Sequence, residues 1–145
     1  ELNNLYKPRV ALSAEQVQKS AESQKRAKTM EYINNRYFEK LSNHNLYIME
    51  SNHDIEMLMN GNYPFHLKKR ILSDKGHLSN SDCAYYLSEF IGDKTNTIIL
   101  AHLSDDNNTY ELALSTVKNV LESKNKKVKN ILIAKQKQRT EMIEV

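Results

Sequence analysis

Three short apolar runs, separated by helical patterns, organise the chain from residue 46 onward. They are Leu46–Met49 (LYIM), Thr97–Ala101 (TIILA) and Asn130–Ala134 (NILIA). Their length and their β-branched or aromatic side chains are typical of buried strands. Because strands that alternate with helices are joined by crossovers, these three strands are expected to run parallel. The pattern predicts an α/β fold with about three strands and flanking helices.

Short helices are predicted on both sides of the first strand. One helix ends at Leu41 in the sequence YFEKL, and DIEMLMN (Asp54–Asn60) forms another before Gly61, a residue that often closes helices. Pro64 suits the first turn of a further helix, PFHLKKRILS.

Two longer helical patterns have an apolar face. Ser79 with Asp82 gives the first helix a capping signal, and Gly92 is expected to end it. Its apolar face consists of Cys83, Tyr86, Leu87, Phe90 and Ile91. The second helix is expected to start at Asp105 or Asp106. Its core-facing stripe consists of Leu114, Val117, Val120 and Leu121.

Residues 1–31 have a different character and are treated as a separate segment, a short tail followed by a polar helix. Ser13 with Gln16 forms a capping-box pattern at the helix start. The apolar stripe is thin and mostly alanine, so this helix gains little from packing. It is expected to lie on a surface, pair with a partner helix or fray. The remaining residues, 32–145, form the predicted domain.

The composition is that of a globular protein: of the 145 residues, 39% are hydrophobic and 27% are charged. No apolar run approaches the roughly 20 residues of a membrane span, and no signal-peptide pattern opens the chain. These features predict a soluble, cytoplasmic protein without a membrane partner. Cys83 is the single cysteine, which excludes an internal disulfide. The start at Glu1 rather than Met indicates a processed chain or a piece of a longer one.

Positive charge is concentrated near the C-terminus, although the net charge is only +3. Between Lys118 and Arg139 the only acid is Glu122. The bases there are Lys118, Lys124, Lys126, Lys127, Lys129, Lys135, Lys137 and Arg139. A basic face of this kind could meet phosphates. The alternative interpretation is a solvated helix end and tail.

Candidate chemical groups follow two of the predicted strands. Glu50 closes the first strand and His102 closes the second, and parallel strands bring their carboxyl ends to one edge of a sheet. His77 lies just before a capped helix. Glu, His and His from three segments are the usual composition of a metal or acid-base site.

Each of these residues also has a structural interpretation. A histidine after a strand is often held only by hydrogen bonds, and Glu50 could cap the turn that follows it. Asn52, His53 and Asp54 fit turn and helix-capping roles. His44 and His66 have no supporting context and are interpreted as surface or packing residues.

The run ESNHDIEMLMNGNYPFHLKKRILSDKGHLSN (Glu50–Asn80), followed by IILAHLSDDNN (Ile98–Asn108), closely resembles the YycJ branch of the metallo-β-lactamase superfamily. The similarity extends over about residues 32–134. It implies that residues 32–145 are the C-terminal half of an αββα sandwich. It also implies a phosphodiester hydrolase that uses one or two Mn or Zn ions, a DNA exonuclease of 5′-to-3′ polarity in its complete form.

The resemblance also implies roles for single residues. His102, in AHLS, matches the last metal-ligand histidine of the superfamily. Glu50 and His77 match the acidic and histidine motifs of the related ribonuclease Z enzymes, EAT and HST, which act as a proton-relay pair. Candidate site-lining residues from the same blocks are Asn52, His53, Asp54, Ser79 and Asn80.

The chain departs from the family pattern in two places. The main metal motif, His-x-His-x-Asp-His, is absent. Where a TDTGY-like stretch should supply a bridging aspartate, the chain reads AKTMEY, and Glu31 is the only acid there. Most of the family's metal site is therefore missing from this sequence. Three strands also make a thin sheet for a domain of this length, which indicates a missing half or a partner chain.

Three hypotheses follow for the function. The chain is part of a nuclease whose activity belongs to the complete fold, with DNA preferred to RNA as substrate. Alternatively, it is a catalytically incomplete fragment or paralogue that acts as a binding or assembly module. In the third hypothesis, a second chain completes the metal site across an interface.

Overall fold

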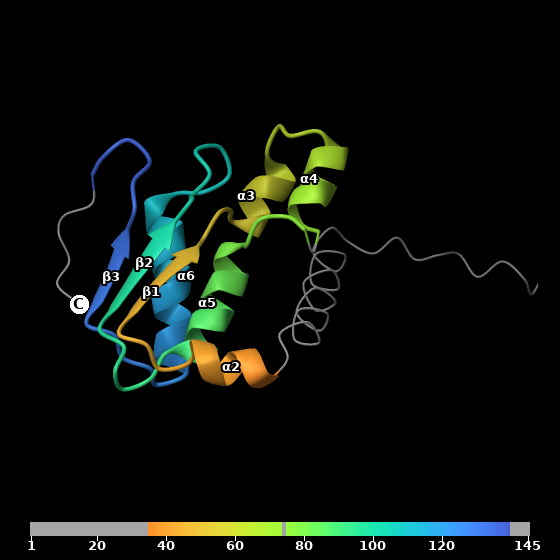
Figure 1. Cartoon of the computed structure of the whole chain (residues 1–145). Coiled ribbons are helices and arrows are strands. Elements are labelled where there is room, and N and C mark those ends of the chain that lie inside the picture. Colours follow the sequence, from red (N-terminus) through yellow and green to blue (C-terminus); the bar gives the residue numbers. More distant parts are fainter. Residues whose placement is uncertain (1–34, 74, 140–145) are drawn as a thin grey trace, which may run out of the picture. The chain divides into compact units, whose positions relative to one another are not determined.

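The structure is a computed structural model in which residues 35–73 and 75–139 are described. The predicted polar helix of the N-terminal segment and the boundary near residue 32 lie outside these residues and stay predictions. The described chain alternates helices and strands, and the sheet lies beside its helices (Figure 1). None of the helices within these two ranges has the length and apolar character needed to cross a membrane.

The sheet has three parallel strands, as predicted. They are β1 (Leu46–Glu50), β2 (Thr97–Ala101) and β3 (Asn130–Ile133), in the spatial order β1-β2-β3. β3 ends one residue before the predicted Ala134, although the Ala134 N–H still donates to the Leu100 carbonyl at 2.9 Å. The α/β class is confirmed, and the assignment to half of an αββα sandwich remains a prediction.

Three short helices flank β1 in sequence. α2 spans Asn35–Leu41, α3 spans Ile55–Asn60 and α4 spans Phe65–Ile71. Asp54 caps α3, because its carboxylate accepts a hydrogen bond from the Met57 N–H at 2.9 Å. Pro64 is the residue before the first turn of α4 and not part of it.

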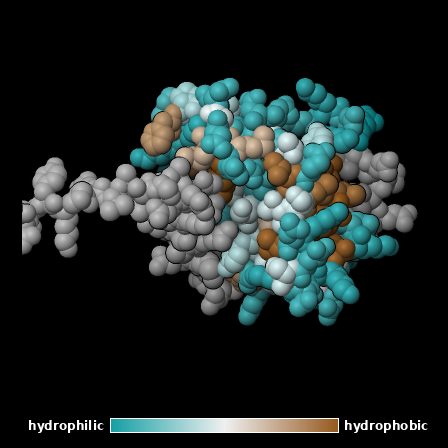
Figure 2. All heavy atoms as spheres, turned by 180° about the vertical axis from the view of Figure 1, so that it is seen from behind, coloured by the Kyte–Doolittle hydropathy of each residue, from teal (hydrophilic) through white to brown (hydrophobic). Residues whose placement is uncertain are grey.

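The two longer helices form one layer. α5 (Asn80–Phe90) and α6 (Tyr110–Ser123) pack against each other; in Figure 1 α6 lies behind the strands and α5 lies beside β1. Seen from behind, hydrophilic side chains cover much of this layer, with hydrophobic patches between them (Figure 2). The predicted α5 face is buried, and Val117 and Leu121 of α6 are buried with it. α5 ends at Phe90, before the predicted Gly92.

The predicted start of α6 at Asp105 or Asp106 is wrong. Residues 105–107 form a turn, and the helix begins at Tyr110 after Thr109, whose hydroxyl accepts the Leu112 N–H at 3.1 Å. The turn is held by the Asn107 N–H, which donates to Ser104 Oγ at 3.2 Å. Thr109 therefore takes the capping role that the two aspartates resembled in sequence.

The two faces of the sheet differ. Tyr47, Ile98 and Leu100 point into the core between the sheet and α5–α6. On the other face Ile48, Ile99 and Leu132 stand in one register row. Ile48, in the middle of β1, is 64% exposed and Leu132 is 36% exposed, whereas Ile99 between them is only 7% exposed. No helix of the described residues packs on this row, which we call the open apolar row.

Candidate acid-base and metal site

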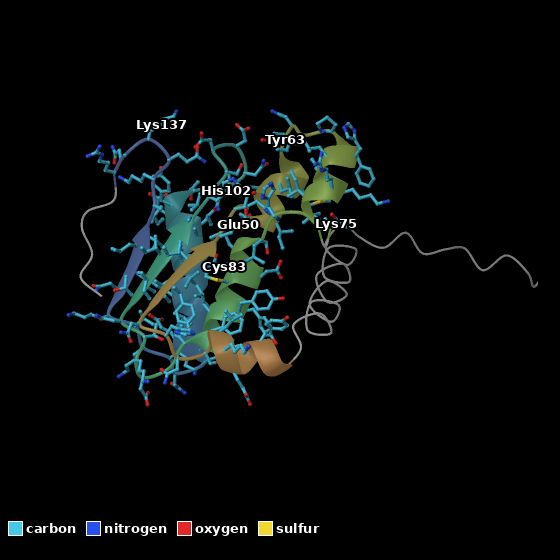
Figure 3. The ribbon with its side chains drawn as sticks, viewed as in Figure 1. Glu50, Tyr63, Lys75, Cys83, His102 and Lys137 are labelled. Carbon is cyan, nitrogen blue, oxygen red and sulfur yellow. The ribbon has the colours of Figure 1, made fainter. Side chains whose placement is uncertain are left out.

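One carboxylate joins three segments at the carboxyl end of the sheet. Glu50 Oε1 lies 2.8 Å from His77 Nδ1 and 2.6 Å from His102 Nδ1. Its Oε2 accepts the Leu78 N–H at 3.0 Å. Figure 3 shows Glu50 and His102 side by side beyond the strands. The predicted convergence of Glu50, His77 and His102 is thus present in the fold.

The strand register explains the approach of His102. Glu50 is paired with Ala101, so His102 is the residue directly after the partner of Glu50. The backbone of His102 has a φ of 57°, a left-handed conformation that few residues other than glycine adopt. Its carbonyl accepts a hydrogen bond from Asn52 Nδ2 at 2.8 Å. This turn directs the ring to Glu50 instead of continuing the strand.

The approach of His77 depends on a short extension of the sheet. The Asn52 N–H donates to the Leu78 carbonyl at 2.8 Å, and the Asn80 N–H donates to the His53 carbonyl at 2.9 Å. Residues 78–80 therefore run parallel to residues 51–53, which follow β1. Gly76 makes the preceding turn possible, since a Cβ there would overlap the Ile71 carbonyl.

The three side chains are open to solvent to different degrees. The exposed fractions are 30% for Glu50, 46% for His77 and 60% for His102. Burial tends to raise the pKa of Glu50, but the Leu78 N–H, His102 and His77 hydrogen bonds outweigh it and lower this pKa below 4.5. Glu50 is therefore ionised at neutral pH and accepts hydrogen bonds from both Nδ1–H groups. Because Nδ1 faces Glu50, Nε2 is the atom of each ring that remains for a metal ion.

The donor set fits a metal ion. One ligand atom from each of Glu50, His77 and His102 can be chosen so that all lie within 4.8 Å of one another. Two histidines and a carboxylate are a common ligand set of Zn. However, the Nδ1 atoms are already hydrogen-bonded to Glu50. The geometry therefore favours binding through Nε2, with Glu50 orienting the rings, as carboxylates do beside metal-bound histidines.

A buried polar network lies beneath these groups. Asn108 Nδ2 donates to the Ser51 and Asn52 carbonyls at 2.9 and 3.1 Å and to Asn80 Oδ1 at 2.9 Å. Asn80 Nδ2 in turn donates a hydrogen bond to Asn108 Oδ1 at 2.8 Å, and Ser51 Oγ donates to Asn80 Oδ1 at 2.7 Å. These amides connect the residues after β1, the start of α5 and the start of α6.

The predicted site-lining residues have different positions. Asn52 lines the hollow beside the site, and His53, although fully buried, also borders it. Asp54 caps α3 and does not border that hollow. Ser79 and Asn80 are buried at the start of α5, where Ser79 Oγ accepts the Asp82 N–H at 3.1 Å. These two residues do not border the hollow and belong to the buried structure beneath it.

A hollow of about 620 Å³ opens beside His77 and His102. It lies between α4 and the residues after β2, and its walls include Tyr63, Arg70, Lys75 and Gln136. None of these four residues was predicted from the sequence as part of the site. Tyr63 donates its hydroxyl proton to Asp106 at 2.7 Å, and this hydrogen bond raises the pKa of Tyr63 above its usual value. The basic KKR run, residues 68–70, and Lys75, close to His77 in sequence, were the available signal.

The basic residues near the C-terminus do not form one face. Lys124 through Lys129 precede β3 and so lie at the amino end of the sheet, away from Glu50. Two of them are engaged there: Lys124 Nζ lies 2.6 Å from Glu89 Oε1, and Lys126 Nζ donates to the Ile91 carbonyl at 2.9 Å. Lys135 and the bases after it follow β3, and Figure 3 shows Lys137 beyond the carboxyl end.

Comparisons with known proteins identify similar exodeoxyribonucleases. The chain is 48% identical over 93 residues to the exodeoxyribonuclease YycJ of Bacillus anthracis, a match that covers 64% of this chain and 35% of that protein. It is 46% identical over 90 residues to the exodeoxyribonuclease WalJ of Streptococcus pneumoniae, covering 62% and 34%. The chain thus spans about a third of the length of the curated relatives it matches. No family model and no solved structure matches it.

Proposed function

We propose that this chain carries part of the active site of a metal-dependent phosphodiester hydrolase of the metallo-β-lactamase superfamily. In its complete form the enzyme is a DNA exonuclease of 5′-to-3′ polarity. The observation that carries the proposal is the Glu50 carboxylate, which is hydrogen-bonded to His77 and His102 at the rim of a parallel sheet. The similarity to two proteins named exodeoxyribonucleases supports the choice of substrate.

The residues have separate roles in this proposal. His102 offers Nε2 as a ligand to Mn or Zn. One or two such ions, once held there, would supply a hydroxide at neutral pH and would stabilise negative charge on the phosphate. Glu50 holds both rings through Nδ1. In its imidazolium form, with Nδ1–H on Glu50, His77 gives the Nε2 proton to the departing oxygen and becomes neutral; its ring centroid lies 5.1 Å from that of His102.

Cleavage of a 5′-phosphorylated DNA duplex in the presence of Mn tests this function. We expect cleavage, measured with the part of the enzyme that completes the metal site, to fall at least about 100-fold in His102→Ala, because the ligand is removed. His66→Ala is the matched control, since His66 is exposed on α4 and does not border the hollow. Equal cleavage by wild type and His102→Ala would reject the assigned role of His102.

The open apolar row favours a second candidate, an assembly module that is catalytically incomplete by itself. Ile48 is 64% exposed in the middle of a strand, which is unusual for a parallel sheet, whose two faces are normally covered. No cleavage by any variant, together with a stable oligomer that forms in a chelator, would support this candidate. Association that requires metal would instead support a site completed by a second chain.

A further inference from the structure

The wall of the hollow opposite the sheet is positively charged. Arg70 in the last turn of α4 and Lys75 in the loop after it border the hollow, together with His77 and His102. Among the described residues, no aspartate or glutamate lines it. A neighbouring hollow of about 250 Å³, beyond Leu103 and Ser104, is lined by Asp105 and Glu111 and has the opposite character. The larger hollow is therefore suited to an anion.

The charges on this wall are available to a ligand. Within the described ranges, neither Arg70 nor Lys75 forms an ion pair, and both side chains are exposed. Lys68, in the same turn of α4, differs, because its Nζ donates to the Met59 and Gly61 carbonyls at 2.7 Å each. Lys68 thus ties α4 to the end of α3, which leaves Arg70 and Lys75 as the cations of the wall.

The polar groups of the opposite wall also suit phosphate oxygens. Tyr63 donates its hydroxyl hydrogen bond to Asp106, whose carboxylate is not among the described lining residues. Ser104 and Asn107 add a hydroxyl and an amide to the lining. The volume of about 620 Å³ lies in the range of roughly 300–1,000 Å³ that is typical of ligand sites.

We propose that this hollow is a phosphate-binding subsite, in which Arg70 and Lys75 hold the backbone phosphates of a nucleic-acid strand beside His77 and His102. The proposal deepens the function proposed above and rests on it for the identity of the ligand. Binding through point charges to phosphates is independent of base sequence and weakens steeply with salt. The subsite therefore fixes the position of the strand relative to Glu50 and leaves base sequence unread.

Binding of a short fluorescein-labelled oligothymidylate, measured by anisotropy in EDTA from about 20 to 200 mM salt, tests the subsite without any turnover. We expect Arg70→Gln and Lys75→Gln each to weaken binding about 5-fold at low salt. Each should also reduce the slope of log affinity against log salt by about 0.7, the value for one contact with a single strand. Lys69→Gln is the matched control, because Lys69 is exposed in the same turn and does not border the hollow.

Three results would overturn the subsite: no binding by the wild-type chain, unchanged slopes in Arg70→Gln and Lys75→Gln, or an equal loss in Lys69→Gln. Thymidine monophosphate serves as the competitor. If it displaces the oligothymidylate at an equal concentration of phosphate groups, the ligand of the subsite is a single phosphate and not a strand. The two proposals fail separately. Binding that is lost in Arg70→Gln, with no hydrolysis even when the rest of the enzyme is present, would support the subsite and contradict the proposed hydrolase. Hydrolysis that is unchanged in both variants would contradict the subsite alone.

Discussion

At the scale of single residues, Glu50 has the largest expected influence on the site. Its carboxylate accepts hydrogen bonds from both rings and from the Leu78 N–H. Glu50→Gln keeps the shape but puts an amide where two Nδ1 donors converge. We expect the affinity for Zn to fall about 10- to 100-fold, the usual effect of losing a group that orients a metal ligand.

A competition titration with a chromophoric zinc chelator measures this affinity. Glu56→Gln is the control, because Glu56 is exposed on α3 and removes the same charge at a distance from the rings. If the Glu50 and Glu56 variants bind Zn equally well, Glu50 does not orient the ligand.

Cys83 gives a second prediction for a single residue. The side chain is fully buried in α5, and burial raises the pKa of its thiol from 9.0 to about 12. The raised pKa favours the protonated folded state, so this contribution to stability is complete below pH 9.0 and is lost as the pH rises towards 12. We expect a thiol reagent at pH 8 to label Cys83 only as fast as the chain opens. Rapid labelling of the folded chain would show that the thiol is accessible.

At the scale of elements, Asn108 connects three segments that carry the site. Its amide bonds reach the residues after β1 and the start of α5, and its Oδ1 also accepts the Thr109 N–H at 2.9 Å. Asn108→Ala leaves several buried polar groups without this partner, so we expect a loss of about 2–4 kcal/mol in the free energy of unfolding. Urea denaturation measures it, with exposed Asn119→Ala on α6 as the control. A similar small change in both variants would mean that water replaces the amide.

The sequence predicted the elements better than the polar contacts between them. Strand ends and parallel order followed from the apolar runs, and these were sufficient to bring Glu50 and His102 to one edge. Asn108 could not be recognised, because an asparagine before a helix has the same appearance in sequence whether it faces water or a buried partner. Arg70 borders the hollow through the packing of α4 beside the site, a tertiary feature that periodicity does not encode.

At the scale of the whole molecule, the described part of the chain has one covered and one uncovered sheet face. The helices α5 and α6 bury the first, and the open apolar row marks the second. The sequence predicted this imbalance, since three apolar strands need covering structure on both sides. An exposed apolar sheet face tends to associate with another surface, because burial of apolar area is favourable.

Sedimentation velocity across a range of concentrations tests whether this face drives association. We expect the wild-type chain to associate and Ile48→Lys to shift it towards the monomer, because a charge on the row would be buried without a partner. The stability of the monomer should change by less than about 0.5 kcal/mol, since Ile48 is already 64% exposed. Leu112→Lys is the control on the opposite side of the fold, where the α6 side chain of Leu112 is 37% exposed. If Leu112→Lys disrupts association and Ile48→Lys does not, the contact is made by the helices, and the sheet face is covered in some other way.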